Sequence, residues 1–220
     1  MTSTATLTAE GLTKRFNAAP LFAPVSFELR AGEIVAITGS NGTGKTTLLK
    51  MIASVLSPTK GSVAYHVESK PIPKDEYQPY LGYAAPYLEL YAELTAIEHL
   101  QFIAELKGKS MDSGECVSLL TSLGLEAAVA HSDRQVKQYS SGMQQRVKLA
   151  MAFALAPRFI FLDEPSSNLD AAGIERLFHH ITDAAHNGAI VMIATNDAAE
   201  TELATRRVAV ERYVAPSRQA

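Results

Sequence analysis

The chain has 220 residues, enough for one full domain or one domain with an inserted subdomain. Hydrophobic residues make up 47% and charged residues 20%, a globular balance that excludes disordered and fibrous classes. The formal net charge of −3 argues against a protein held to nucleic acid by a general basic field, and the single cysteine excludes an internal disulfide. With no secretory signal and no apolar run of about 20 residues, we expect a soluble, intracellular chain.

Sequence patterns predict an α/β core with a small antiparallel sheet at its start. Residues 1–32 and 60–68 read as short strands with turns. Residues 33–38, 159–163 and 189–195 are apolar almost throughout, as are strands buried on both faces of a parallel sheet. Helical patterns over residues 46–56 and 170–187 lie between these runs, and strands alternating with helices imply an α/β core.

A helical segment interrupts this alternation between residues 88 and 140. Thr95 and Glu98 form a capping box that opens one helix, and residues 112–123 form a second one, closed by Gly124. We expect a single domain over residues 1–220, in which residues 1–87 and 141–220 make the α/β core with its β subdomain. Residues 88–140 are then an inserted helical subdomain.

The turn after the first apolar strand has the pattern G-x-x-x-x-G-K-[ST], which is typical of a phosphate-binding loop. Its residues are Gly39, Ser40, Asn41, Gly42, Thr43, Gly44, Lys45 and Thr46. Glycines let successive N–H groups point at an anion, and the following helix adds its positive end. Lys45 is expected to reach the β- and γ-phosphates and the Thr46 hydroxyl to ligate Mg²⁺. A plain glycine-rich turn is the alternative, but the flanking strand and helix favour nucleotide binding.

An acidic pair, Asp163 and Glu164, ends the strand at residues 159–163. With the phosphate loop expected on a neighbouring strand, Asp163 is placed to hold Mg²⁺ opposite Thr46. Glu164 is placed to orient and deprotonate a water that attacks the γ-phosphate. A solvated pair at a strand end is the alternative when no phosphate loop is present.

A serine–glycine helix start lies between the phosphate loop and the acidic pair. Ser140 or Ser141 caps a helix that runs to about residue 156, and Gly142 follows, leaving free N–H groups as a second anion site. In this position the chain resembles the ATP-binding-cassette (ABC) ATPases, whose signature motif lies here. The resemblance covers nearly the whole chain, and residues 81–95 align without gaps to the family's Q-loop region.

The resemblance implies a P-loop NTPase core with a mainly parallel sheet, a small N-terminal antiparallel β subdomain and an inserted all-helical subdomain. It implies that ATP contacts residues 39–46 with Thr47, that Phe16 stacks on adenine, and that residues 167–170 form the D-loop with Asp170. In the family, nucleotide on one subunit's phosphate loop is capped by the partner subunit's serine–glycine helix start. Two ATP molecules are therefore expected in a head-to-tail dimer.

Two positions depart from the family pattern. The Q-loop glutamine position holds Pro86, which supplies no side-chain ligand, and the switch histidine position holds Asn196, which donates a hydrogen bond but cannot become a cation. The signature itself has Ser141 and Met143 in place of a glycine and a glutamine. Because Lys45, Asp163 and Glu164 are intact, we expect a working but slower ATPase, with Glu164, Lys45 and Asn196 catalytic and Mg²⁺ held by Thr46 and Asp163.

The leading hypothesis is the ATP-hydrolysing subunit of an efflux-type membrane transporter, bound at the cytoplasmic face of the membrane. Its expected partners are a second ABC subunit and integral membrane permease subunits, with no nucleic acid. A soluble ABC ATPase, for example one serving iron–sulfur assembly, is an alternative. A nucleotide-gated dimerisation module with little turnover is another, favoured by Pro86 and Asn196. Tyr87, Leu90 and Tyr91 are either core residues or part of a partner-docking surface.

Overall fold

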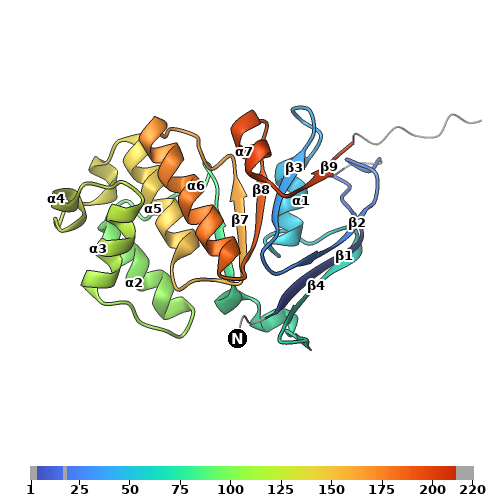
Figure 1. The fold of residues 1–220 in the computed structure, drawn as a ribbon, viewed down its shortest axis with the longest axis horizontal. Coiled ribbons are helices and arrows are strands. Elements are labelled where there is room, and N and C mark those ends of the chain that lie inside the picture. The colour runs from blue at the N-terminus through green and yellow to red at the C-terminus, as the bar shows by residue number, and fades with distance from the viewer. Residues whose placement is uncertain (1–3, 17–18, 212–220) are drawn as a thin grey trace, which may run out of the picture.

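A computed structural model of the chain describes residues 4–16 and 19–211 (Figure 1). Its strands are β1 (Ala5–Thr13), β2 (Val25–Arg30), β3 (Ile34–Thr38), β4 (Lys60–Val67), β5 (Lys70–Pro71), β6 (Leu81–Ala84), β7 (Phe159–Asp163), β8 (Ile190–Ala194) and β9 (Arg206–Ala209). Its helices are α1 (Lys45–Ile52), α2 (Ala96–Leu106), α3 (Ser113–Ser122), α4 (Ala127–Ala130), α5 (Ser141–Phe153), α6 (Ala171–His186) and α7 (Ala198–Leu203). None of the helices in these described ranges combines the length and apolar character that a membrane span requires.

Two sheets organise the molecule, and both are of the predicted kinds. The parallel sheet has the order β6-β7-β8-β3-β9, and the antiparallel sheet has the order β2-β1-β4-β5. The carboxyl ends of β3, β7 and β8 lie in register, since Ile37 and Asp163 both pair with Ala194. One expectation is wrong: the strands that carry the phosphate loop and the acidic pair are not neighbours, because β8 lies between them.

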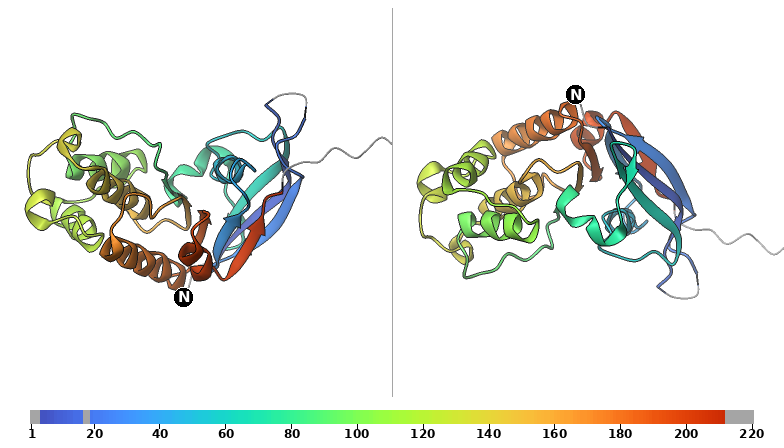
Figure 2. Two further views of the ribbon diagram at one scale, coloured as in Figure 1. Left: turned by 90° about the horizontal axis from the view of Figure 1, so that it is seen from above. Right: turned by 90° about the horizontal axis from the view of Figure 1, so that it is seen from below.

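Each face of the parallel sheet packs against its own hydrophobic core. Phe159 and Phe161 of β7 face the core that contains α1 and the antiparallel sheet, whereas Ile160 and Leu162 face the core that contains α2, α3, α5 and α6. Helix α1 therefore lies between the two sheets. The near-continuous apolar runs follow from this burial on both faces. Figure 2 shows helices α2 to α6 gathered at one end and the antiparallel strands at the other.

Two helices at this end begin with capping boxes, of which the sequence analysis predicted the first. The Thr95 and Glu98 pair caps α2, and Asp112 with Glu115 caps α3 in the same way. The segment from 88 to 140 is not helical throughout, however, since residues 88–94 form irregular chain. Their backbone is held by other means: the Tyr91 N–H donates to His99 Nε2 at 3.0 Å, and the Val136 N–H donates to the Leu94 carbonyl at 2.9 Å.

Two helices end earlier than their patterns predicted. Helix α1 stops at Ile52, and Ser54 takes a left-handed backbone with φ of 58°. Helix α5 stops at Phe153, and Leu155 turns the chain with φ of 66° before Pro157. In both cases a left-handed residue ends the helix within three residues, although no glycine signals it.

Candidate active site

The phosphate loop joins β3 to α1 and folds around the side chain of Lys45. The Lys45 ammonium is buried in the loop and donates to the carbonyls of Gly39 at 2.9 Å and Ser40 at 3.4 Å. The Thr43 hydroxyl closes the loop by donating to the Ser40 carbonyl at 2.9 Å. The loop thus places a fixed cation at the N-terminus of α1, where helix N–H groups also face an anion.

Two of the loop glycines are required by backbone conformation and by space. Gly44 has φ of 105°, and a Cβ there would lie 2.7 Å from a Leu21 methyl group and 2.8 Å from the Phe22 ring. Gly39 has φ of 151°, and a Cβ would lie 2.6 Å from the Val210 carbonyl oxygen. Side chains at these positions would be strained by φ and would also displace the connection between β1 and β2 or the end of β9.

Asp163 and Thr46 meet at the carboxyl edge of the parallel sheet, as the sequence predicted. The Thr46 hydroxyl donates to Asp163 Oδ1 at 3.0 Å, although β8 separates their strands. Burial raises the pKa of Asp163 above its ordinary value, and hydrogen bonds from the Thr46 and Tyr87 hydroxyls oppose that rise. A hydroxyl and a carboxylate oxygen side by side are ligands that Mg²⁺ accepts.

Glu164 follows with a strained backbone. Its φ is 43°, in the left-handed region that costs a non-glycine residue about 1–3 kcal/mol. The Glu164 N–H donates to the Ala194 carbonyl at 2.9 Å, and its own carbonyl accepts from the Ser167 N–H at 3.1 Å. These two bonds hold the turn, so the exposed Glu164 carboxylate leaves the sheet edge in a defined direction.

Asn196 reaches the phosphate loop from the end of β8. Its Nδ2 donates to the Asn41 side-chain oxygen. Because β8 lies between β3 and β7, this amide stands between the phosphate loop and the acidic pair. The order of strands, which the sequence did not predict, accounts for that position.

The remaining predicted contacts on this side are less buried. Phe16 is 64% exposed, and the Lys14 ammonium lies 5.6 Å from the centre of its ring. The chain that follows it brings Leu21 and Phe22 against Gly44. Thr47 is half-buried in the first turn of α1. An exposed aromatic ring on the connection beside the phosphate loop is suited to stacking on a flat ligand.

The serine–glycine helix start lies elsewhere in the chain. Ser140 caps α5 by accepting from the Met143 N–H at 3.3 Å, and a Cβ on Gly142 would lie 2.7 Å from the Asn168 carbonyl oxygen. Helix α5 packs on β6, β7, α2 and α3, whereas α1 packs on β1, β3, β7 and β8. Among the described residues, no hydrogen bond joins 140–142 to 39–46. One chain therefore holds the loop at Asn168 against the helix start, but does not join the helix start to the phosphate loop.

Helix α5 also holds several loops of the site, through contacts that the sequence did not reveal. Gln145 donates to the Pro165 carbonyl at 2.9 Å, Arg146 bonds Asp170 at 2.7 Å, and Lys148 donates to the Pro86 carbonyl at 2.6 Å. The bond from the Gly173 N–H and the charge of Arg146 lower the pKa of Asp170. Residues of one helix thus fix the turn after Glu164, the start of α6 at Asp170 and the segment at Pro86.

A second missed feature is a pair of tyrosine hydroxyls beside Asp163. Tyr83 and Tyr87 hydrogen-bond each other through their hydroxyls, and the Tyr87 hydroxyl lies close to the carboxylate of Asp163. Tyr87 is 46% exposed and Tyr91 is 61% exposed, so neither is a core residue, whereas Leu90 packs against the core. No periodic pattern links these tyrosines to Asp163, because Tyr83 lies in a short strand and Tyr87 in an irregular segment.

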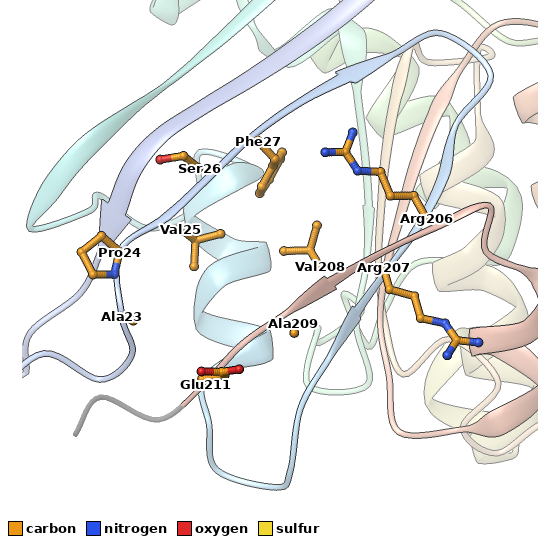
Figure 3. A pocket seen from close by; sticks show the side chains of 10 residues that line it. All are labelled: Ala23, Pro24, Val25, Ser26, Phe27, Arg206, Arg207, Val208, Ala209 and Glu211. Carbon is orange, nitrogen blue, oxygen red and sulfur yellow. The ribbon is translucent and has the colours of Figure 1, made fainter.

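Two cavities contain no residue of the phosphate loop. The first is a groove of about 520 Å³ lined by the segment after β6, the turn at 136–138 and α5, with the residues Pro86, Tyr87, Leu88, Glu89, Leu90, Ala92, Val136, Lys137, Gln144 and Lys148. A second cavity of about 330 Å³ lies between β2 and β9, where Val25 and Phe27 face Val208 (Figure 3). The second cavity contains none of the residues predicted for the site.

The fold and the edge shared by Lys45, Thr46, Asp163 and Glu164 define a P-loop nucleotide-binding domain. Residues 22–167, more than half of the chain, match the ABC transporter family model, and the chain belongs to that family as an ATPase subunit. It is 34% identical to the cytochrome c biogenesis ATP-binding export protein CcmA of Escherichia coli K12, over 80% of this chain and 82% of the relative. The matched part of the chain is a single nucleotide-binding domain.

Solved structures agree on the fold. The ATP-binding cassette MJ0796, a dimer in a post-hydrolysis state with ADP and Pi, matches with a TM-score of 0.80 and 25% identity over 93% of this chain and 94% of that one. A putative ABC transporter ATP-binding protein of Pyrococcus furiosus has a TM-score of 0.77 at 21% identity, covering 93% and 97% of the two chains. At that identity the likeness concerns the fold alone.

Proposed function

We propose that two such subunits close head to tail around two ATP molecules, and that their hydrolysis drives a membrane export permease from the cytoplasmic face. The meeting of Thr46 with Asp163 beside the Lys45 loop carries the proposal, because it assembles one half of a hydrolysis site. The other half, Ser140 to Gly142, belongs to a helix that packs on a different side of the sheet. A partner subunit would supply it.

The proposed metal is Mg²⁺, held by the Thr46 hydroxyl and the Asp163 carboxylate. In the described part of the chain, no group of three or more His, Cys, Asp or Glu side chains could hold an ion. A cation at this edge would therefore complete its shell with water and phosphate oxygens, as Mg²⁺ does. When bound, it would neutralise charge on the transferring phosphoryl group.

The chain's own groups then have separate tasks. Lys45 and the loop N–H groups hold the β- and γ-phosphates, and the Asn196 amide donates toward the γ-phosphate. Glu164 accepts a proton as its water attacks phosphorus, the γ-phosphoryl bond to the leaving oxygen breaks, and ADP and phosphate result. The fixed turn of Glu164 restricts where that carboxylate stands, which favours orientation of the water.

Similarity to the export protein CcmA supports the assignment to export. The groove of about 520 Å³ after β6 is the proposed seat for a cytoplasmic segment of the permease. It combines apolar residues such as Leu88 with charged residues from two elements, Glu89 and Lys137. An amphipathic helix suits such a groove, with its apolar face against residues such as Leu88 and its polar flanks toward the charged residues.

Replacing the proposed base tests closure and turnover together. We expect Glu164→Gln to reduce steady-state ATP hydrolysis about 10²–10⁴-fold, because the general base is lost. With ATP and Mg²⁺ the variant should accumulate as an ATP-bound dimer in light scattering. Glu175→Gln, an exposed glutamate on α6, is the matched control. Equal turnover in wild type and Glu164→Gln would instead favour a nucleotide-gated module.

Docking is tested by capture from detergent-solubilised membranes. Wild type should retain a multi-span membrane protein, and Leu88→Arg, which places a charge in the groove, should lose it. Leu106→Arg, at a 56% exposed position on α2 that does not line the groove, should retain it. Recovery of soluble partners alone would defeat the transporter proposal and favour a soluble ABC ATPase.

A further inference from the structure

Tyr87 directs its polar end toward the proposed metal site. The residue before it, Pro86, has no side-chain donor, whereas the Tyr87 hydroxyl bonds the Tyr83 hydroxyl and lies close to the Asp163 carboxylate. Its ring is 46% exposed, yet the Lys50 ammonium covers one face at 3.9 Å from the ring centre. Although the ring is partly exposed, the hydroxyl contact at one end and the Lys50 ammonium on one face restrain the orientation of the Tyr87 side chain.

The surrounding elements fix that direction. Tyr83 lies opposite Phe161 in the β6–β7 ladder, so its side chain is on the same face of the sheet as Asp163, two residues further along β7. Lys50 is four residues from Thr46 on α1, which places both on one face of that helix. Tyr87 is thus held between the strand that supports Asp163 and the helix that carries Thr46.

Both phenols are neutral donors near neutral pH. Burial raises the pKa of Tyr83 to about 12, and burial and the hydrogen bond with Tyr83 also raise the pKa of Tyr87. Each hydroxyl has one hydrogen to donate and lone pairs to accept with. The Tyr87 hydroxyl, paired with that of Tyr83, is thus available as a donor toward the Asp163 carboxylate, whose other lone pairs remain free to accept.

We infer that the Tyr87 hydroxyl is a positioning group of the hydrolysis site, which orients the Asp163 carboxylate and holds a water ligand of its cation. The inference rests on the proposed cation site at Thr46 and Asp163. It assigns to Tyr87 a polar contact that Pro86, at the preceding position, cannot make. The Tyr87 side chain is longer than the proline ring of Pro86 and so reaches the edge of the sheet. Lys148 holds this segment in place by donating a hydrogen bond to the Pro86 carbonyl.

The test is Tyr87→Phe, which removes the hydroxyl and keeps the ring under Lys50. Mn²⁺ affinity is measured by electron paramagnetic resonance with a non-hydrolysable ATP analogue present, and analogue affinity is measured separately in EDTA. We expect Mn²⁺ affinity to fall about threefold to tenfold, the loss of one hydrogen bond, with analogue affinity in EDTA unchanged. The kcat should fall while the KM for ATP changes little. Tyr83→Phe should shift Mn²⁺ affinity in the same direction but less.

Tyr91→Phe is the matched control, since Tyr91 is 61% exposed and packs edge-on against Phe102. It should change none of these quantities. Unchanged Mn²⁺ affinity in Tyr87→Phe, with or without a lower melting temperature, would overturn the inference. Asp163→Asn separates the two proposals: if it weakens Mn²⁺ binding while Tyr87→Phe does not, only the role of Tyr87 is wrong. If neither variant weakens it, the cation site itself is wrong.

Discussion

Lys45 is the charged centre of the phosphate loop. Its ammonium is already oriented by the Gly39 and Ser40 carbonyls, so a phosphate would meet a cation that needs little reorganisation. Orientation before binding reduces the entropy that is lost on binding. The loop's affinity for polyphosphate should therefore depend strongly on this one side chain.

We expect Lys45→Ala to weaken ATP binding about tenfold to a hundredfold, the loss of a charge-assisted hydrogen bond. Isothermal titration calorimetry with ATP and Mg²⁺ measures the change. Lys60→Ala, at an exposed position in β4, serves as the control and should bind like wild type. Full affinity in Lys45→Ala would refute the assignment of this loop to phosphate.

Most residues that motifs predicted have local contacts; the pair of Thr46 and Asp163, 117 positions apart, is the exception, because two motifs of one kind of site predict it together. Gly39, Gly44 and Lys45 interact within one turn, and Asp170 caps its own helix by accepting from the Gly173 N–H at 2.9 Å. By contrast, Tyr87 and Lys148 act on residues 62 or more positions away. Such pairs depend on how the strands are ordered, and one sequence does not encode that order in any local pattern.

The segment before α2 is held by a buried histidine. His99 is fully buried, its Nδ1 lies 2.7 Å from the Thr95 carbonyl, and its Nε2 accepts from the Tyr91 N–H. These two bonds require a neutral ring protonated on Nδ1. Burial lowers the pKa of His99, an effect that the Thr95 carbonyl and the Glu98 charge oppose in part.

Because the pKa of His99 is lower in the folded state, the unfolded chain takes up its proton first as the pH falls. The free energy of unfolding should therefore be fully retained above about pH 7 and decrease as the pH falls through about 6.5. Urea denaturation at a series of pH values measures this slope, and His99→Gln should flatten it. His179→Gln, an 80% exposed histidine side chain on α6, should leave the slope unchanged. If the unfolding free energy of His99→Gln fell with pH as steeply as that of wild type, the assignment of this pH dependence to His99 would be wrong.

Strands were predicted where apolar runs are long and missed where they are not. Strand β6 contains Gly82, and a Cβ there would lie 1.9 Å from the Ala152 carbonyl oxygen, so its sequence is set by contact with α5 rather than by strand propensity. Strand β9 begins with Arg206 and Arg207 and pairs only with β3 at the sheet edge. Charged residues suit an edge strand but weaken its apolar pattern.

The parallel sheet contributes residues to two hydrophobic cores, so the stability of each core depends on the same strands. Phe161 faces α1 and the antiparallel sheet, and Leu162 faces α5 and α6. If either core opened, the apolar side chains on one face of β7 would be exposed to water. The proposed helical subdomain would then unfold together with the α/β core.

We expect Phe161→Ala and Leu162→Ala each to destabilise the protein by about 2–5 kcal/mol, through cavities on opposite faces. Both should lower the midpoint of the same thermal transition, followed by far-ultraviolet circular dichroism and by tyrosine fluorescence. Exposed Val55→Ala is the control and should shift the midpoint little. Two separate transitions, each sensitive to one variant, would show that the cores unfold independently.

Helix α5 imposes one more restriction, on where the chain tolerates a change of length. Gln145, Arg146 and Lys148 each reach a different loop, and an α-helix turns about 100° per residue. One residue inserted after Gly142 would keep the helix but rotate all three side chains away from their loops together. The turn between α2 and α3 does not position loops of the site in this way. Among relatives, insertions and deletions should therefore accumulate between residues 107 and 111 and be absent from 142 to 148.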